Sequence, residues 1–163
     1  MPLTPFHWSI LIFGLLSLSF FYIPALIISS SIMDIEPFYY MFISPGTGAL
    51  HGFFHTYVGA TIIGVVVAFV LIKLRKPTDS LMSRFKLDQT KITEKFIYIS
   101  SIFAAYSHIF LDSFMHGDMK PFWPFTAVNP LLGLISVNSI YLITGCGLVS
   151  VVLVYLLRLS KIR

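Results

Sequence analysis

The chain has 163 residues, of which 56% are hydrophobic and only 11% are charged, and its mean hydropathy is +0.86. This composition leaves too little polar surface to cover a soluble globule, which excludes a soluble enzyme, a nucleic-acid-binding module and a disordered protein. We expect one membrane domain over residues 1–163, built as an all-α polytopic bundle of three to four transmembrane helices.

Charged segments divide the chain into apolar stretches, most of which reach the roughly 20 residues that a helix needs to cross a bilayer. The expected segments are an N-terminal helical region over residues 1–54, a span over 55–74, a basic loop over 75–95, a span over 96–116, an outer loop over 117–130, and a last span with a basic tail over 131–163.

The first apolar stretch, residues 8–33, is compatible with two forms. As one helix its 26 residues would extend about 39 Å, more than the roughly 30 Å hydrocarbon core, and Pro24 would interrupt its hydrogen bonds near the middle. As a re-entrant hairpin of two half-length helices, it would turn near residues 21–24 and need other helices to bury the turn. A single span leaves His7 far from Asp34, whereas the hairpin returns His7 to the depth of Asp34.

Two pairs of metal-ligating side chains follow this stretch. Asp34 and Glu36 stand two positions apart directly after it, and His51 and His55 stand four positions apart in the sequence HGFFHT. A four-residue spacing places both histidine rings on one helix face if this turn is already helical. We expect the span over residues 55–74 to start here.

The positive charges are concentrated in two segments. Seven of the eleven lysines and arginines lie between Lys73 and Lys95, and three more lie at the C-terminus. By the positive-inside tendency, both segments are expected on the cytoplasmic side of a cell membrane. Because ten cations belong to the loop and the tail, the basic net charge does not indicate a nucleic-acid partner.

The span over residues 96–116 carries three further ligating side chains at four-residue spacing. His108, Asp112 and His116 put nitrogen, oxygen and nitrogen donors in a row along one helix face. A single intramembrane histidine more often bonds a neighbouring helix, but several such motifs in one small chain favour a metal site, since burying these groups unpaired is costly. Cys146 is the only cysteine, so no thiolate cluster forms. The donors suit zinc, manganese, iron or magnesium, and two adjacent metals are possible.

The chain outside the basic segments is acidic. Lys120 stands there against four carboxylates, and the balance of −3 would attract a metal cation. Trp8, Trp123 and the aromatic residues 38–40 border the same region. We interpret them first as an interfacial aromatic belt and second as a floor for an acyl chain of a membrane lipid. The four carboxylates are Asp34, Glu36, Asp112 and Asp118.

At these residues the sequence resembles the membrane-bound metal-dependent hydrolase-like proteins, small inner-membrane proteins distantly similar to zinc-dependent phospholipase C. The resemblance covers most of the chain up to about residue 125. Family members commonly show P-D-x-D and H-R-G-x-T-H-S, where this chain has MDIE and HGFFHT; the missing arginine removes a natural phosphate clamp. The matching positions are His7, Asp34, Glu36, His51, His55, His108, Asp112, Gly117, Pro124 and Phe125.

The resemblance favours the hairpin form of the first stretch and implies a metal-dependent hydrolase. We expect it to act on a lipid or a lipid-linked ester at the extracytoplasmic interface, with a divalent metal, zinc favoured, that activates a water. Glu36 is the candidate general base, although it could equally be a ligand. The expected metal ligands are His7, Asp34, His51, His55, His108, Asp112 and His116.

Two other functions compete with the hydrolase. The first is a non-enzymatic subunit of a larger membrane assembly of the respiratory or metal-oxidase type, in which partner membrane subunits cover the helices. Small residues on helix faces, at Ala60, Gly64 and residues 145–147, fit close helix packing in such an assembly. The second is ligation of a b-type haem by His55 and His108, which leaves the other donors without a role.

Overall fold

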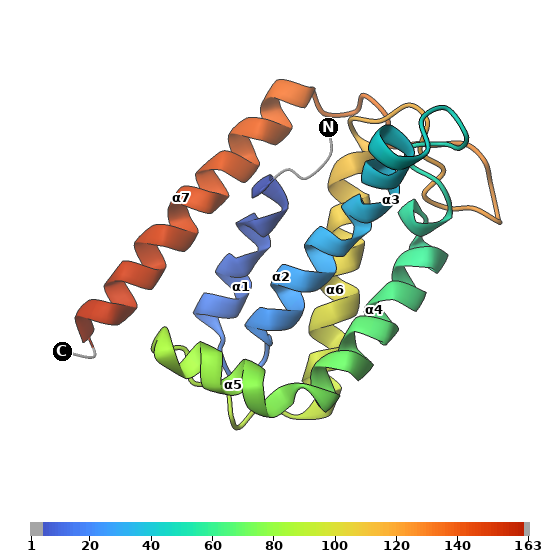
Figure 1. Ribbon diagram of the computed structural model, residues 1–163. Helices are drawn as coiled ribbons and strands as arrows, with labels where there is room; N and C mark the ends of the chain where they lie inside the picture. Colours follow the sequence, from blue (N-terminus) through green and yellow to red (C-terminus); the bar gives the residue numbers. More distant parts are fainter. Residues whose placement is uncertain (1–4, 162–163) are drawn as a thin grey trace.

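The computed structural model describes residues 5–161, and over that range the chain forms helices and no strand. The long helices run side by side, and α5 lies across one end of them (Figure 1). In chain order the elements are η1 (Pro5–Ile10), α1 (Leu11–Leu16), α2 (Ile23–Ser31), η2 (Ile32–Asp34), α3 (Ile35–Phe38), η3 (Tyr39–Ile43), η4 (Phe53–His55), α4 (Tyr57–Lys73), α5 (Arg75–Arg84), α6 (Glu94–Ser113) and α7 (Val137–Lys161).

The architecture is the all-α membrane bundle expected from the sequence. The continuous helical stretch Ile23–Ile43 and α7 are each long and apolar enough to cross a bilayer, and α4 with α5 could supply a third span. α6 has 20 residues, the length of a span, but it is the inner helix. It packs against both α2 and α4, so its buried face can carry polar side chains that a lipid-facing helix could not.

The first apolar stretch turns back on itself as in the hairpin form, and one continuous helix over residues 8–33 is wrong. Only the first arm is half-length, however, because the second arm belongs to the helical stretch Ile23–Ile43, which is long enough to cross a bilayer. α1 ends at Leu16, the chain turns over residues 17–22, and α2 runs back beside α1 from Ile23 (Figure 1). Pro24 lies in the first turn of α2, where a helix has no N–H bond to lose. Proline therefore starts the second arm, and the turn comes slightly earlier in the chain than expected.

The turn of the hairpin is held by side chains from the segment after α5 and from α6. The Gln89 side chain accepts the Ile23 N–H at 2.8 Å and donates to the carbonyls of Leu18 and Phe21. The Tyr22 N–H donates to Ser100 Oγ at 2.8 Å. These bonds satisfy backbone groups that neither water nor lipid could reach, which is the condition for a buried turn in a membrane protein.

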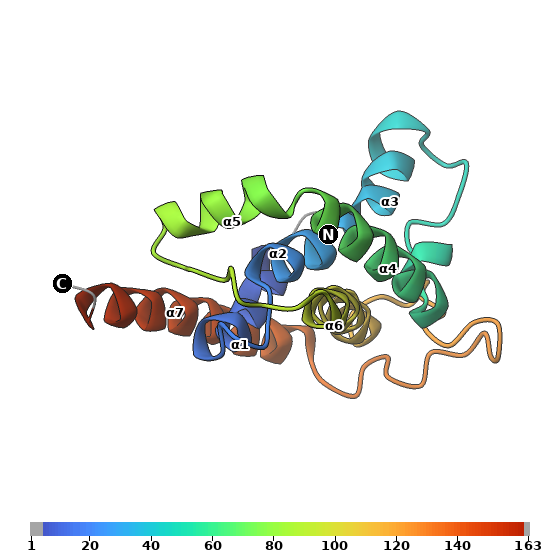
Figure 2. The same ribbon diagram turned by 90° about the horizontal axis from the view of Figure 1, so that it is seen from below.

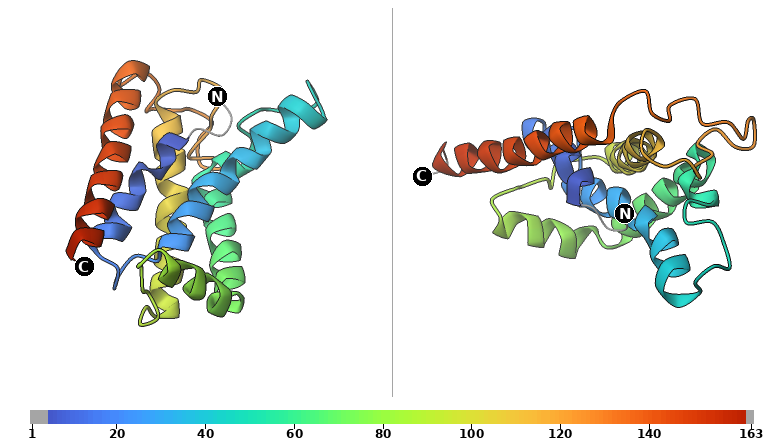
Figure 3. Two further views of the ribbon diagram at one scale, coloured as in Figure 1. Left: turned by 60° about the vertical axis from the view of Figure 1, so that its left-hand side comes forward. Right: turned by 90° about the horizontal axis from the view of Figure 1, so that it is seen from above.

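The second arm continues beyond the point where the sequence predicted its end. Helical structure persists through η2, α3 and η3 to Ile43, so Asp34 and Glu36 lie within a continuous helical stretch rather than after it. The last part of this stretch projects beyond the neighbouring helices (Figure 3). The acidic pair is thereby placed beside α4 and α6 and not in a loop.

α2 and α6 run parallel in a fixed register. Two hydrogen bonds set it: Tyr22 N–H to Ser100 Oγ, and His108 Nδ1 to the Ser30 carbonyl at 2.7 Å. Both join residues 78 positions apart in the sequence, so the register between the two helices is constant over their common length. His108 is consequently level with the end of α2.

α4 packs closely on α6 through small residues, as the sequence predicted. Ala60 and Gly64 are buried, and a Cβ on Gly64 would lie 3.0 Å from the Cα of Ile102. Small residues at such a contact let two helix backbones approach. The approach brings the start of α4 to the end of α6.

The basic segment after α4 is partly helical, where the sequence predicted a loop. α5 occupies residues 75–84 and bends by 81° from α4, so it lies across the bundle (Figure 2). Pro77 stands near the start of α5, where proline costs no intrahelical hydrogen bond. α5 and the positively charged end of α7 lie at the same end of the bundle, which we call the basic end (Figure 1).

The last helix starts later than the predicted residue 131. α7 begins at Val137, and the Ser136 hydroxyl caps it by accepting an N–H of the first turn at 3.1 Å. α7 packs on η1 and α1. Gly147 faces Ser9, where a Cβ would come within 2.7 Å of the Ser9 Cβ, so the predicted close packing is confirmed at this glycine.

Candidate metal centre

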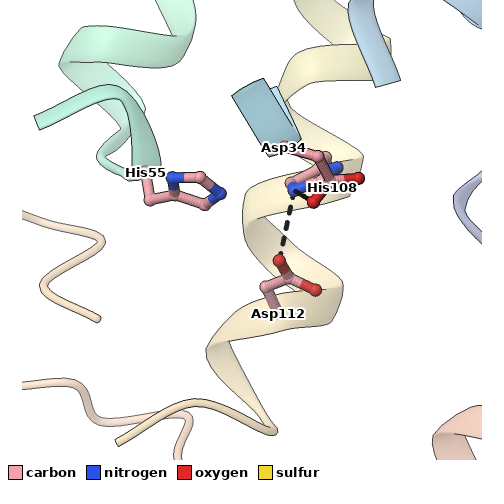
Figure 4. A group of neighbouring side chains, drawn as sticks. All are labelled: Asp34, His55, His108 and Asp112. Atoms are coloured by element: carbon pink, nitrogen blue, oxygen red, sulfur yellow. Dashed lines mark ion pairs between the residues drawn. The ribbon is translucent and has the colours of Figure 1, made fainter. Parts of the chain in front are cut away.

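The candidate ligands gather at the end of the bundle opposite the basic end, which we call the site end. Asp34 comes from η2, His55 from η4, and His108 and Asp112 from α6 (Figure 4). All four side chains are buried, and each offers a ligand atom within 4.8 Å of those of the others. Two atoms that bind one zinc ion at about 2.0–2.1 Å lie at most about 4.2 Å apart, so small side-chain movements bring the four donors together.

His108 and Asp112 share one face of α6, as their spacing predicted. His108 Nε2 lies 3.1 Å from Asp112 Oδ2 and 3.8 Å from Asp34 Oδ1. The other ring nitrogen, Nδ1, lies 2.7 Å from the Ser30 carbonyl, and a carbonyl only accepts, so Nδ1 carries a proton. Nε2 has no partner with hydrogen-bond geometry, and it faces two carboxylates.

His55 shows the same pattern from the opposite side of the cluster. Its Nδ1 donates to Glu36 Oε2 at 2.8 Å, while its Nε2 is buried without a hydrogen-bond partner. Glu36 also accepts the Gly52 N–H at 3.1 Å. A Cβ at Gly52 would come 2.6 Å from Glu36 Oε1, so glycine permits this approach. A histidine oriented by a carboxylate on one nitrogen and free on the other is typical of metal ligands.

His7 lies beside the cluster, which is the consequence of the hairpin. Its Nε2 is 3.3 Å from Asp112 Oδ1, and its ring stacks on His108 with 3.9 Å between centroids. His7 Nδ1 is buried without a hydrogen-bond partner. The N-terminal arm therefore returns His7 to the edge of the centre, where its Nε2 contacts Asp112, but His7 belongs to neither group of closely spaced donors.

A second group of donors adjoins the first on the side of the outer loop. His51, His116 and Asp112 bring their ligand atoms within 4.8 Å of one another, so Asp112 belongs to both groups. The rings of His51 and His116 stack at 4.1 Å. Burial, and to a smaller extent the neighbouring His51, lowers the pKa of His116 to about 4. His116 is therefore neutral at physiological pH, the form in which imidazole binds metals.

Asp118 orients His51, a contact that the sequence did not predict. Both carboxylate oxygens of Asp118 lie 2.9 Å from His51 Nδ1. Burial works to raise the pKa of Asp118, but the hydrogen bond and the charge of His51 lower it below its ordinary value. Asp118 entered the sequence analysis only as a negative charge, because no local pattern relates it to His51, 67 positions away.

The predicted helix face for His51 and His55 is wrong, although the two rings do meet. α4 begins only at Tyr57, since the Thr56 side chain caps it by accepting the Gly59 N–H at 2.9 Å. A short 3-10 turn over Phe53–His55 instead brings the ring centroids of His51 and His55 to 4.8 Å. His116 likewise lies beyond the end of α6 rather than on its face.

These side chains match the ligand preferences of a divalent cation better than they match an apolar protein interior. Histidine nitrogens and carboxylate oxygens without thiolates are ligands for zinc, iron or manganese. Asp34 and Asp112 are buried carboxylates, and buried anions require a compensating charge. Because Asp112 belongs to both groups, it could serve as a ligand shared by two adjacent ions.

Comparison with known proteins places the chain in a family. A family model described as YdjM inner membrane protein matches residues 8–162, a range that contains every candidate ligand except His7. No curated protein and no solved structure matched the chain. The family description agrees with the apolar helices and gives an inner-membrane location. Since the match extends over nearly the whole sequence, the chain belongs to the YdjM inner membrane protein family.

Proposed function

We propose that the centre binds a divalent metal, with zinc favoured, and that the protein is a metal-dependent hydrolase of a lipid or lipid-linked ester. One observation carries the metal: His55 and His108 each direct a buried, unpartnered Nε2 toward Asp34 and Asp112, while an acceptor holds the opposite nitrogen. Burying ring nitrogens without partners is costly, and one cation removes that cost for both.

A hydrogen-bonded network without metal explains less of this geometry. If His108 were doubly protonated, its positive charge would compensate one of the two nearby carboxylates, Asp34 or Asp112. His55 would still have a free, fully buried Nε2. A divalent ion offsets both carboxylates and accepts the lone pairs of both histidines.

Hydrolysis is the chemistry that such a centre supports at a membrane surface. A bound divalent cation supplies Lewis acidity and lowers the pKa of water toward neutrality. The chain contributes the fixed ligands and the residues that orient them. Glu36 holds His55 in place, and its role as general base stays a prediction. Asp118 holds His51 in the same way at the outer-loop side.

Two pockets flank the segment that carries His51 and His55, and they suit the two parts of a lipid. One, of about 330 Å³, is lined mostly by apolar side chains and reaches Glu36. The other, of about 240 Å³, is lined by His51, Asp118 and Lys120. An acyl chain fits the first, and a polar or anionic headgroup fits the second, where Lys120 offers a cation in place of the arginine missing from HGFFHT. The apolar pocket is lined by Ile32, Ile35, Glu36, Tyr39, Tyr40, Phe54 and Ile63.

Metal analysis of the purified, chelator-free protein tests the first half of the proposal. We expect one or two zinc ions per chain, and loss of metal in His108→Ala and His55→Ala. Ser101→Ala removes another buried polar group of α6 that has no hydrogen-bond partner and serves as the matched control, which should keep its metal. A metal-free parent, or equal metal loss in the control, would refute the site.

An activity assay tests the second half separately. Zinc-loaded protein in mixed micelles is offered phospholipids, lipid-linked phosphate esters and acyl esters, and release of product is followed. Asp112→Asn should abolish turnover, and Lys120→Met should raise the KM for anionic substrates while leaving the metal content unchanged. A metal-loaded protein that turns over none of these esters would leave the metal site standing and remove the hydrolase.

The alternative proposal is a subunit of a larger membrane assembly. α7 is only lightly buried by the rest of the chain and presents Leu142, Val149, Leu153 and Leu156 on its surface, which lipid or a partner helix could cover. Mild-detergent purification distinguishes the two. Other membrane chains in fixed stoichiometry would favour the subunit, and an isolated active protein would exclude it.

A further inference from the structure

The basic end of the molecule contains an apolar pocket that the proposed hydrolase does not use. It measures about 320 Å³, within the roughly 300–1,000 Å³ of ligand pockets. It lies between the two arms of the hairpin, the segment that ends α5, and α7. Its lining residues are Leu11, Leu15, Ile23, Ile27, Met82, Phe85, Leu87, Val151, Val152 and Tyr155; we call it the basal pocket.

No ordinary polar ligand suits the interior of the basal pocket. Its lining is aliphatic and aromatic, and the one hydroxyl, that of Tyr155, donates to the Phe85 carbonyl at 3.0 Å. Water in such a space would lack the two to four polar partners that it needs. Leaving the pocket empty would forfeit dispersion contacts along the whole lining. An extended hydrocarbon chain satisfies both conditions.

Positive side chains are placed next to lining residues on two sides of the basal pocket. Arg84 and Lys86 flank Phe85 in the sequence, and within residues 5–161 neither makes an ion pair. From α7, Arg158 Nη1 donates to the carbonyl of the lining residue Leu15 at 2.6 Å. Two of these cations therefore lie at the end of α5 and one lies on α7, both of which supply lining residues of the pocket.

Nearby carboxylates do not neutralise this charge. Asp79 is already bound to Arg75 and to the Tyr22 hydroxyl. Asp88, which follows Leu87 and accepts hydrogen bonds from Thr90, stays an anion, so one negative charge stands against the three cations. The region around the pocket therefore keeps a net positive charge.

We propose that the basal pocket binds one anionic phospholipid, with an acyl chain in the apolar interior and its phosphate at Arg84, Lys86 and Arg158. Basic clusters beside a membrane surface attract anionic headgroups, each cation strengthening binding roughly fivefold. The lipid joins α7 to the hairpin at the end of the molecule away from the metal centre. It is a structural ligand, independent of the proposed hydrolase activity.

Native mass spectrometry of the full chain in detergent, with phosphatidylglycerol or phosphatidylcholine of identical acyl chains, tests the proposal. We expect one phosphatidylglycerol to be retained per chain and to raise the unfolding temperature more than phosphatidylcholine does. Arg84→Gln with Lys86→Gln should weaken phosphatidylglycerol binding roughly 25-fold, because two cations are lost. Lys76→Gln with Lys95→Gln removes the same charge from the same end, outside the pocket lining, and should change binding little.

A second pair of variants tests the interior. Val151→Phe fills the basal pocket and should prevent retention of the lipid, whereas Val149→Phe makes the same change on the exposed surface of α7 and should not. Equal retention of the two lipids, equal weakening by both charge pairs, or full retention in a folded Val151→Phe protein would each overturn the proposal. If Val151→Phe does not fold, the two charge pairs decide.

Discussion

The chemical state of the centre depends on which nitrogen of each histidine is free. The Nδ1–H of His108 donates a hydrogen bond to the Ser30 carbonyl, that of His55 donates to Glu36, and Nδ1 of His51 pairs with Asp118. In each case the acceptor fixes the ring and leaves Nε2 toward the other donors. The candidate ligands are therefore already oriented, which would reduce the reorganisation that binding of a metal requires.

Glu36→Gln measures how much this orientation contributes. The amide oxygen can still accept the His55 proton, but it lacks the charge that raises the basicity of the ring. We expect zinc affinity to fall about 10–100-fold, as is usual when such a partner is changed, in a competition titration against a chromogenic chelator.

The control for this prediction is Asp88→Asn, which removes an exposed carboxylate from the basic end. Its zinc affinity should equal that of the parent. If Glu36→Gln instead retains full affinity and loses only turnover, Glu36 acts as the general base and its contact with His55 is incidental.

At the scale of elements, sequence patterns predicted the helices better than their ends. The spacing of His108 and Asp112 was sufficient to place them together, because both lie within one regular helix. The pair His51 and His55 had the same spacing, but the Thr56 cap keeps them outside α4. The end of a helix depends on a single capping residue, and the spacing of side chains along the sequence does not reveal which residue that is.

Contacts between segments far apart in the chain could not be predicted from the sequence either. Gln89 lies in the basic segment, where its sequence context predicts a solvated loop residue, yet it is buried under the hairpin turn. Nothing near it in the chain relates it to Leu18 or Phe21. The hairpin itself was predictable only as one of two forms, since Pro24 is compatible both with a break and with a helix start.

Gln89→Ala should weaken the hairpin. It leaves the Ile23 N–H and the carbonyls of Leu18 and Phe21 without partners, and each unsatisfied buried group costs about 1–3 kcal/mol. We expect a lower unfolding temperature in detergent and weaker zinc binding, because the first arm carries His7. Thr90→Ala changes the exposed neighbour and should behave as the parent. An unchanged unfolding temperature in Gln89→Ala would show that water replaces the amide.

Gly64→Val tests the close contact of α4 and α6. The added carbons meet the backbone of Ile102, and overpacking of this kind typically costs about 1–3 kcal/mol. Val65→Ile, on the exposed side of the same helix, should leave thermal unfolding unchanged. A Gly64→Val protein as stable as the parent would mean that α4 and α6 can move apart to accommodate the larger side chain without a cost in stability.

For the whole molecule, the centre joins elements that are otherwise held mainly by apolar packing. Its ligands come from the N-terminal arm, the second arm, the segment before α4, and α6. A metal that binds only the folded arrangement therefore stabilises the complete bundle. At a free concentration of 100 times Kd the gain is about 2.7 kcal/mol.

Metal removal should consequently lower the unfolding temperature of the parent protein. We expect a chelator to cause a clear shift, zinc to reverse it, and Asp112→Asn to show neither change because the ion is already absent. The measurement is intrinsic tryptophan fluorescence during heating, in matched detergent. Identical unfolding of chelated and zinc-loaded parent would indicate that the donors form a packing motif.

The orientation of the bundle in the membrane follows from the same two ends. The basic end carries α5 and the positive end of α7, so the positive-inside tendency predicts that this end faces the cytoplasm and that the site end lies at the opposite face. Ser83→Cys in α5 and Gly117→Cys in the outer loop, each in a Cys146→Ala background, report the two ends. In intact cells, an impermeant maleimide should label Gly117→Cys at once and Ser83→Cys only after permeabilisation.

Labelling of both cysteines from one side would contradict the prediction that the bundle crosses the membrane. The reverse order would place the metal centre at the cytoplasmic face, where a substrate would have to come from the inner leaflet.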